Sequence, residues 1–304
     1  CPIVYRKIIG PRCSVILMTR SDVHTHGTCD DSTDPTPGEL ARHAADTIAR
    51  RSGIDHHDIA LVLGSGWGGA ADLIGETISE IPAAEVPGFF APAVAGHVPV
   101  MRSIRVHGSD TVALVLGSRT HYYEGKGVRA VAHGMRTAAA AGARTVVLTN
   151  GCGGLNPQWS PGQAVLIRDH INLTGASPLE GATFVDLTDL YSQRLRTVAH
   201  TIDPTLPEGV YVQFPGPHYE TPAEVKMAGI LGGDLVGMST TLEAIAAREA
   251  GMEILGISLM TNLAAGISPE PLSHAEVIAA GQEAAPRIAR LLADIVQAIA
   301  TDAE

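Results

Sequence analysis

Cysteine is scarce in this chain, and its distribution excludes a disulfide framework. Of the 304 residues four are cysteine: Cys1, Cys13 and Cys29 lie within the first thirty residues, and Cys152 stands alone in the body. Disulfides therefore cannot brace the main fold, and a cytoplasmic protein is the simpler expectation. Nothing in the sequence around Cys152 would lower the pKa of a thiol, so we expect this cysteine to be chemically inert.

Long hydrophobic runs are missing as well, and no segment is long enough to span a bilayer. The start of the chain is basic and then apolar, but the uninterrupted apolar run Val15–Met18 is shorter than a signal-peptide core and no small-residue cleavage site follows. Residues 19–36 are rich in Asp, Ser, Thr and His. We therefore expect 1–36 to be a poorly ordered extension, with a native start at Met18, and 37–304 to be the folded domain.

Positive charge is in the minority. The chain has 21 Lys and Arg against 32 Asp and Glu, a formal net charge of −11. Proteins that coat nucleic acid or lie on a membrane surface need a net basic face, so we expect neither partner. Any basic site must be local. With 45% hydrophobic residues the chain can build a real core, and neither an internal repeat nor a long linker divides its body.

Metal ligands at zinc-like spacing are also absent. His24 with His26, and His56 beside His57, are suggestive pairs, but no further ligands accompany them. We expect no metal site.

The body shows an alternation of strand and helix patterns. Strands are predicted at Ile59–Leu63, Val98–Val106, Thr111–Leu116, Thr145–Thr149, Ala164–Arg168, Val210–Phe214, Leu235–Met238 and Glu253–Met260. Helices are predicted at Glu39–Arg51, Val128–Ala141, Asp189–Ile202, Pro222–Leu231, Leu242–Ala250 and from His274, after a Ser273 N-cap, to about Ala300. This alternation predicts an α/β fold with a largely parallel sheet and helices on both faces.

Most of the predicted strands end in a glycine-bearing or polar loop. These loops are Gly64–Gly69, Gly117–Gly125, Asn150–Gly154, Gly216–Thr221, Met238–Thr241 and Thr261–Gly266. Ligands of α/β sheets bind at the carboxyl ends of strands, so we expect the loops to converge on one pocket. In one of them Arg119 and His121 offer the fixed charge and multiple donors that a phosphate dianion needs. We interpret that loop as half of a site for an anion and a sugar.

The loop Gly64–Gly69 allows several interpretations. It satisfies G-x-G-x-x-G after a strand, and Glu85 lies about twenty residues further on, which is typical of dinucleotide binding and would favour an NAD-linked oxidoreductase. Its amides and the Ser65 hydroxyl could instead hold one phosphate, or the loop could be a tight turn. The following segment, with Pro87–Phe90 and a hairpin, counts against a second βα unit.

Seven motifs follow one another along the chain. They are Ser65 in Gly-Ser-Gly, Arg119–Gly125, Thr149–Asn156, Gly216–Thr221, Val236–Thr240, Thr261–Asn262 and His274–Val277. In order, type and spacing they closely resemble the trimeric purine nucleoside phosphorylases, from about Glu39 to Ile299. The resemblance implies a single three-layer α/β domain with a twisted mixed sheet flanked by helices. It also implies reversible phosphorolysis of purine ribonucleosides or 2'-deoxyribonucleosides, which yields the free purine and the pentose 1-phosphate.

The resemblance further implies a role for each site residue. Phosphate, a co-substrate and not a cofactor, would be the nucleophile, so neither a protein nucleophile nor a cofactor is expected. Its ligands would be Ser65, Arg119, His121, Ser239 and the amide near Gly151, with His97 closing over the top. The family commonly has Gly-His-x-Gly where this chain has Gly96-His-Val-Pro99, and Pro99 fixes a φ that glycine would leave free.

For the purine, the resemblance implies that Asn262 accepts from the protonated N7 and donates to the six-oxygen, while Glu220 accepts the N1–H. Adenine lacks that donor, so 6-oxopurines such as inosine and guanosine should be preferred. The remaining nucleoside contacts would be Tyr123, Tyr219, Met238 and His274 along the ribose and Val236 on the base. A homotrimer is implied too, in which an aromatic of Pro87–Phe90 could complete a neighbouring subunit's pocket.

Other interpretations remain open. Arg119 and His121 could form structural ion pairs with Glu124, and Glu220 could merely complement a helix dipole. Val236 and Met238 could be core residues, and His274 a capping residue. Beyond the oxidoreductase, the alternatives are a nucleoside-binding protein without catalysis and a methylthioadenosine phosphorylase. Two residues argue against a methylthioadenosine phosphorylase: Asn262, where that group has Asp, and His274.

Overall fold

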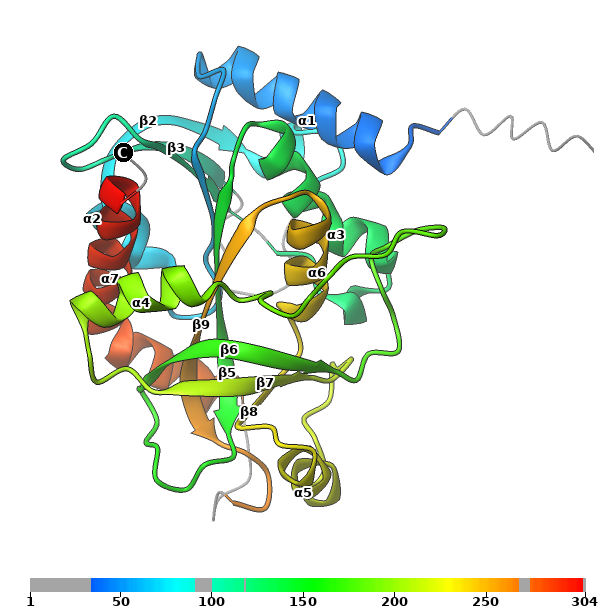
Figure 1. Ribbon diagram of the computed structural model, residues 1–304, viewed down its shortest axis with the longest axis vertical. Coiled ribbons are helices and arrows are strands. Elements are labelled where there is room, and N and C mark those ends of the chain that lie inside the picture. The colour runs from blue at the N-terminus through cyan, green and yellow to red at the C-terminus, as the bar shows by residue number, and fades with distance from the viewer. Residues whose placement is uncertain (1–33, 91–99, 118, 268–273, 303–304) are drawn as a thin grey trace, which may run out of the picture. The chain divides into compact units, whose positions relative to one another are not determined.

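A mixed β-sheet organises the chain (Figure 1). The computed structural model describes residues 34–90, 100–117, 119–267 and 274–302, with the side chains of 274–277 left aside. In these residues nine strands pair in the order β2-β3-β4-β1-β5-β8-β7-β6-β9, and β9 pairs again with β5. The strands are β1 Ile59–Val62, β2 Gly75–Pro82, β3 Val100–Val106, β4 Val112–Leu116, β5 Thr145–Gly154, β6 Ala164–Asn172, β7 Glu208–Gln213, β8 Leu235–Gly237 and β9 Glu253–Leu263.

The centre of the sheet is parallel. Strand β1 pairs in parallel with both β4 and β5, and β5 pairs in parallel with β9. All four residues of β1 are buried, as expected for a strand covered on both faces. The carboxyl ends of these four strands therefore meet at one edge. The pairings of β5 with β8 and of β6 with β9 are antiparallel. Because β9 pairs with both β6 and β5, the strands β5, β8, β7, β6 and β9 close into a ring.

Helices cover both faces and make three layers. They are α1 Pro37–Ser52, α2 Ala71–Ile74, α3 Gly127–Ala140, α4 Gln193–Ile202, α5 Pro222–Ile230, α6 Thr241–Glu249 and α7 His274–Asp302. One buried cluster joins Ile48 of α1 and Met135 of α3 to the sheet, and a second joins Leu195 of α4 and Leu292 of α7 to its other face. The predicted α/β architecture with a mixed sheet and flanking helices is thus confirmed.

Two predicted loops are wrong, because their residues belong to strands. Asn150–Gly154 continues β5, and Thr261 and Asn262 continue β9; the two stretches pair with each other. The glycines are needed for close packing and do not mark a turn: a Cβ on Gly154 would lie 2.0 Å from Sδ of Met260, and one on Gly153 would lie 3.2 Å from Val236. A glycine run therefore gave a false loop signal.

Other boundaries also differ from the prediction. Strand β2 was not predicted; it lies antiparallel to β3 at the edge of the sheet, and most of its residues are exposed, which weakens its apolar pattern. Helix α4 begins at Gln193, after the N-cap Ser192, and not at Asp189. Strand β6 continues to Asn172, four residues past the predicted Arg168. Of the predicted extension 1–36, residues 1–33 lie outside the described residues, and so does the predicted N-cap Ser273.

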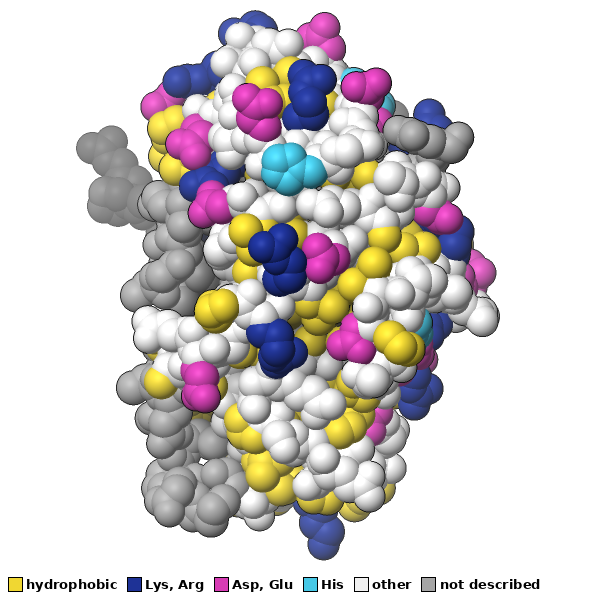
Figure 2. All heavy atoms as spheres, turned by 90° about the vertical axis from the view of Figure 1, so that its left-hand side faces the viewer, with side chains coloured by type: hydrophobic (Ala, Val, Ile, Leu, Met, Phe, Trp, Pro, Cys, Tyr) yellow, Lys and Arg dark blue, Asp and Glu magenta, His cyan; other side chains and the backbone are white. Residues whose placement is uncertain are grey.

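The surface shows no concentration of positive charge on the face that carries α7. Acidic and basic side chains are interspersed there among the described residues (Figure 2). No helix in the described part of the chain is long and apolar enough to cross a membrane.

Candidate active site

A cavity of about 130 Å³ opens at the carboxyl ends of the central strands. The predicted residues that line it are Ser65, Arg119, His121, Tyr123, Gly151, Tyr219, Glu220, Val236, Met238, Ser239 and Asn262. Val236 lies in β8, and the others follow β1, β4, β7 and β8 or lie at the carboxyl ends of β5 and β9. The structure thus brings together residues that are up to about two hundred positions apart in the sequence.

Two predicted site residues have no described side chain. His97 lies outside the described residues, and His274 is described only as the first residue of α7. A larger cavity of about 450 Å³ lies elsewhere, among Ser160–Ala164, Asp203–Pro207 and α7, and no predicted site residue lines it. The smaller cavity is the better candidate because it gathers buried polar atoms that lack partners.

Arg119 is buried and firmly held. Its Nε donates to both carboxylate oxygens of Glu243, at 3.0 and 2.8 Å, and its Nη1 donates to the Thr149 carbonyl at 2.8 Å. Its Nη2 is buried and has no hydrogen-bond partner among the described residues. The pairing of Arg119 with Glu124 was therefore the wrong alternative, and the guanidinium keeps one nitrogen for a ligand.

His121, by contrast, does contact Glu124. Its Nδ1 lies 3.4 Å from Oε1 of that carboxylate, which also accepts the His121 backbone N–H and pairs with Lys126. The imidazole stacks on the Tyr123 ring with 4.8 Å between centroids. Burial raises the pKa of Tyr123, so its phenol stays protonated and can donate a hydrogen bond.

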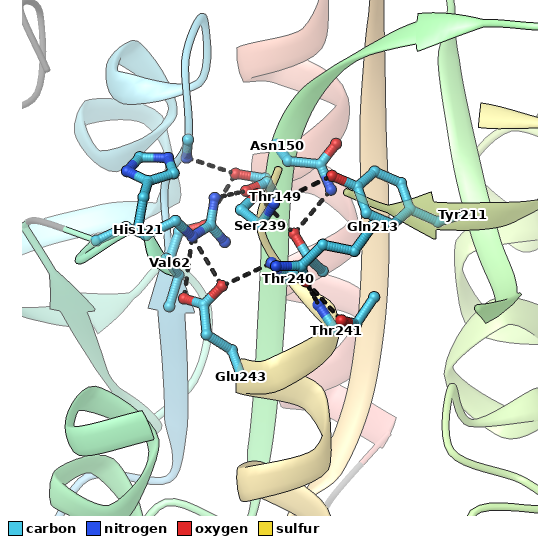
Figure 3. A network of polar contacts seen from close by, with 12 residues as sticks. Val62, His121, Thr149, Asn150, Tyr211, Gln213, Ser239, Thr240, Thr241 and Glu243 are labelled. Carbon is cyan, nitrogen blue, oxygen red and sulfur yellow. Dashed lines mark hydrogen bonds and ion pairs between the residues drawn. The ribbon is translucent and has the colours of Figure 1, made fainter. Parts of the chain in front are cut away.

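The turn from β8 into α6 carries Ser239 in a strained backbone. Thr240 has a φ of 83°, rare for a β-branched residue, and the Thr241 N–H donates to the Ser239 carbonyl across it, forming a γ-turn. Such a conformation costs on the order of 1–3 kcal/mol and persists only where the surroundings impose it. Here the Thr240 N–H donates to Glu243, and Asn150 donates to the Thr240 hydroxyl (Figure 3).

Glu220 is the buried acceptor of the cavity. Only 7% of the residue is exposed, its Oε1 has no partner among the described residues, and burial raises the pKa of its carboxyl. It does not cap α5, because Thr221 and Glu224 form the capping box of that helix. The interpretation of Glu220 as a helix-dipole residue is therefore unnecessary.

Asn262 keeps hydrogen-bonding capacity for a ligand. Its Oδ1 accepts from the Thr261 hydroxyl at 2.9 Å, and its Nδ2 donates to the Leu263 carbonyl at 2.9 Å. A carboxamide has two N–H donors and two acceptor lone pairs, so one of each remains. Asn262 can therefore donate to and accept from the same ligand edge.

Apolar residues complete the lining. Val236 is both a core residue and a wall of the cavity, because its cluster with Phe214 and Ala264 reaches the cavity. Cys152 lines the cavity as well, but complete burial raises the pKa of its thiol to about 12, in agreement with the expected inertness.

The Gly64–Gly69 loop is not part of a dinucleotide-binding unit. A Cβ on Gly64 would lie 2.7 Å from the Thr149 carbonyl, and the buried Trp67 donates to the Asn150 carbonyl, so the loop is folded tightly against β5. The next strand, β2, runs antiparallel to its neighbour, whereas a Rossmann unit requires a parallel one. Glu85 pairs with Arg51, neither of which lines the cavity.

The sequence interpretation missed the buried polar network at the cavity: it did not name Glu243, and it gave no role to Thr149 and Asn150 within their motif. One signal was available, since Thr240 and Glu243 have the spacing of a capping box and form one. Among the described residues no group of three or more His, Cys, Asp and Glu could hold a metal ion.

Comparison with known proteins identifies the family. The family model of the phosphorylase superfamily matches residues 58–297, so the chain belongs to that superfamily. A purine nucleoside phosphorylase of Cellulomonas sp is 72% identical over 271 residues, covering 88% of this chain and 95% of the relative. One from Mycobacterium leprae is 58% identical over 260 residues, covering 86% and 96%. Within the superfamily, the chain belongs to the purine nucleoside phosphorylases.

The likeness extends to solved structures. The crystal structure of Schistosoma mansoni purine nucleoside phosphorylase in complex with inosine has a TM-score of 0.76 at 30% identity, covering 85% of this chain and 96% of that one. A schistosoma purine nucleoside phosphorylase in complex with hypoxanthine has a TM-score of 0.78 at 30% identity, covering 87% and 99%.

Replacing Glu220 by Gln should stabilise the ligand-free protein at pH 7.5. Because the folded state raises the pKa of Glu220, its contribution to stability is present below the unfolded pKa and is lost as the pH rises through the folded pKa. Removing the buried charge should raise the free energy of unfolding at pH 7.5 by on the order of 1 kcal/mol. Thermal melts at pH 7.5 and below pH 5 measure this, and the gain should shrink at the lower pH.

A matched control is Glu224→Gln, four residues further on. The hydrogen bonds from Thr221 lower the pKa of Glu224, so its charge stabilises the folded state at pH 7.5, and removing that charge should lower the melting temperature. A Glu220→Gln protein that is less stable than the unchanged protein at pH 7.5 would contradict the burial argument.

Proposed function

We propose that this protein catalyses the reversible phosphorolysis of purine ribonucleosides and 2'-deoxyribonucleosides, with a preference for 6-oxopurines, in purine salvage in the cytoplasm. The observation that carries the proposal is that a single cavity contains an arginine with a free buried N–H₂ group and a glutamate with a free buried oxygen, so far as the described residues extend. The arginine N–H₂ group can donate hydrogen bonds to an oxyanion, and the glutamate oxygen can accept one from an N–H of a heterocycle. The names of the relatives support the same activity.

In this proposal Arg119, His121, Ser65 and Ser239 hold phosphate with the amide at Gly151. A phosphate oxygen attacks the anomeric carbon while the bond to the purine nitrogen breaks, and the electron pair of that bond leaves with the purine. The anomeric carbon gains oxocarbenium character, which a positioned dianion stabilises more strongly in the transition state than in the ground state. No cofactor and no protein nucleophile is needed. His97 is proposed to close over the phosphate.

The departing base needs its own partners. As the bond breaks, the purine takes up a proton from water at N7; Asn262 accepts a hydrogen bond from this N–H and donates to the six-oxygen, on which negative charge develops. Glu220 accepts the N1–H and so orients the base. Tyr123, Tyr219, Met238 and His274 are proposed to line the ribose, with Val236 against the base. The support for Asn262 and Glu220 is the hydrogen-bonding capacity that each retains in the cavity.

Turnover of inosine with and without inorganic phosphate tests the activity. Hypoxanthine should be released only when phosphate is present, with stoichiometric formation of ribose 1-phosphate. The control is the same protein with NAD and inosine but no phosphate. Hypoxanthine release that does not depend on phosphate, or binding of inosine without any release, would contradict the proposal.

Replacing Asn262 by Asp should move the preference toward 6-aminopurines. A carboxylate can accept a hydrogen bond from the six-amino group but cannot donate to a six-oxygen, so the ratio of kcat/KM for inosine over adenosine should fall by about 10- to 100-fold. The ratio is measured with both nucleosides at fixed phosphate. Unchanged selectivity would remove the basis for the role of Asn262.

We also propose a homotrimer in which an aromatic side chain completes the neighbouring pocket. Phe89 packs against His133 of its own chain, with 4.7 Å between ring centroids, whereas Phe90 is 44% exposed, so Phe90 is the better candidate of the Pro87–Phe90 segment. Analytical ultracentrifugation should give three times the mass of the chain. A monomer with full activity would contradict this arrangement.

A further inference from the structure

We infer that Glu243 is a positioning residue for the phosphate, acting through both Arg119 and Ser239; this inference rests on the proposed function. The carboxylate touches neither the phosphate nor the nucleoside in the proposed reaction, and it does not line the cavity. It connects two of the proposed phosphate ligands from behind, and the geometry of the connection carries the argument.

The first connection is to the guanidinium. The side chains of Arg119 and Glu243 are 2% and 5% exposed, and Nε of Arg119 contacts both carboxylate oxygens. The guanidinium is planar, so hydrogen bonds from two of its nitrogens determine where the third nitrogen points. With Nε on Glu243 and Nη1 on the Thr149 carbonyl, the orientation of the free Nη2 is set before any ligand binds.

The second connection is to the turn that carries Ser239. Oε2 of Glu243 accepts the Thr240 N–H at 3.0 Å, and Thr240 is the residue with φ of 83°. Figure 3 shows the Glu243 side chain at the start of α6, with a dashed contact from its carboxylate to Thr240 in this turn. One carboxylate therefore holds two segments that are more than one hundred residues apart, and a change in it should disturb both at once.

A negative charge beside an anion site also repels the anion, so two effects of Glu243 oppose each other. If repulsion were its main effect, removing the charge would lower the KM for phosphate. If positioning dominates, removing an acceptor would raise it. Glutamine is nearly isosteric with glutamate, and its oxygen could replace Oε2, which accepts from both Arg119 Nε and the Thr240 N–H. It would, however, set an N–H₂ donor against Arg119 Nε in place of Oε1, so the charge-assisted contact of the guanidinium with two oxygens is lost. We expect the positioning effect to dominate, since both partners are buried.

The test compares Glu243→Gln with Glu249→Gln, a matched control on the same helix. Glu249 pairs with Arg136 at 2.9 Å and does not line the cavity. With Glu243→Gln the KM for phosphate should rise by about 10- to 100-fold, the range expected for the loss of one charge-assisted hydrogen bond. The KM for inosine should change by less than about 3-fold. Glu249→Gln should change neither KM.

Direct binding of inorganic phosphate to the nucleoside-free protein, measured by calorimetry, separates this inference from the proposed activity. If the unchanged protein binds phosphate but does not turn over inosine, the proposed activity fails, and the loss of phosphate binding in Glu243→Gln still supports the inference. An unchanged or lowered KM or Kd for phosphate in folded Glu243→Gln protein overturns it. A fall in melting temperature without a change in KM indicates a merely structural role and overturns it too.

Should Glu243→Gln fail to fold, Glu243→Asp decides the question. Aspartate keeps the charge but is one methylene shorter, so it cannot reach both Arg119 and Thr240 in the same geometry. The KM for phosphate should then rise while the KM for inosine stays within about 3-fold of its original value. A phosphate KM equal to that of the unchanged protein would overturn the inference.

Discussion

Strand β5 is the constraint on which the rest of the structure depends. It pairs with β1, β8 and β9, and its carboxyl-terminal residues form the floor of the cavity. A Cβ on Gly154 would collide with Sδ of Met260, and one on Gly153 would lie tightly against Val236, so β8 and β9 pack closely against this part of the strand. The Thr149 carbonyl fixes Arg119, and the Thr149 hydroxyl holds the amide of Gly64. The Gly64–Gly69 loop and Arg119 are thus both held by one residue of β5.

The charged side chains of the cavity are also held in place by neighbouring residues. Arg119 pairs with Glu243, and His121 contacts Glu124, so these two proposed phosphate ligands already have a carboxylate partner. A buried ion pair contributes little net stability, but breaking one is costly, and the pair therefore serves to fix orientation. What the cavity offers a ligand is directed hydrogen-bonding atoms, on Arg119 and Glu220, and not an excess of charge. This fits a protein whose net charge is −11.

The class of fold and most of the cavity residues could be predicted from the sequence. Apolar strands such as Ile59–Leu63 and the amphipathic helix beginning after Thr36 have strong local signals, and seven ordered motifs predicted which side chains converge. The polar network could not be predicted, because the pairing of Arg119 with Glu243 depends on a contact between residues 124 positions apart. Asn150–Gly154 was mistaken for a loop because the close approach that demands glycine comes from β8 and β9, which the local sequence does not reveal. Strand β2 was missed because its mostly exposed residues leave only a weak pattern.

The closure of β5, β8, β7, β6 and β9 into a ring has a consequence for solubility. A closed ring has no unpaired backbone row to offer another chain, so within the described residues the sheet presents a single open margin, at β2. That margin carries the exposed Glu76 and Glu80 and ends at Pro82, which has no N–H to donate. A second copy of this chain that paired its own β2 there would bring its Glu76 and Glu80 toward these carboxylates and would find no donor at Pro82, which disfavours strand-to-strand association at this margin.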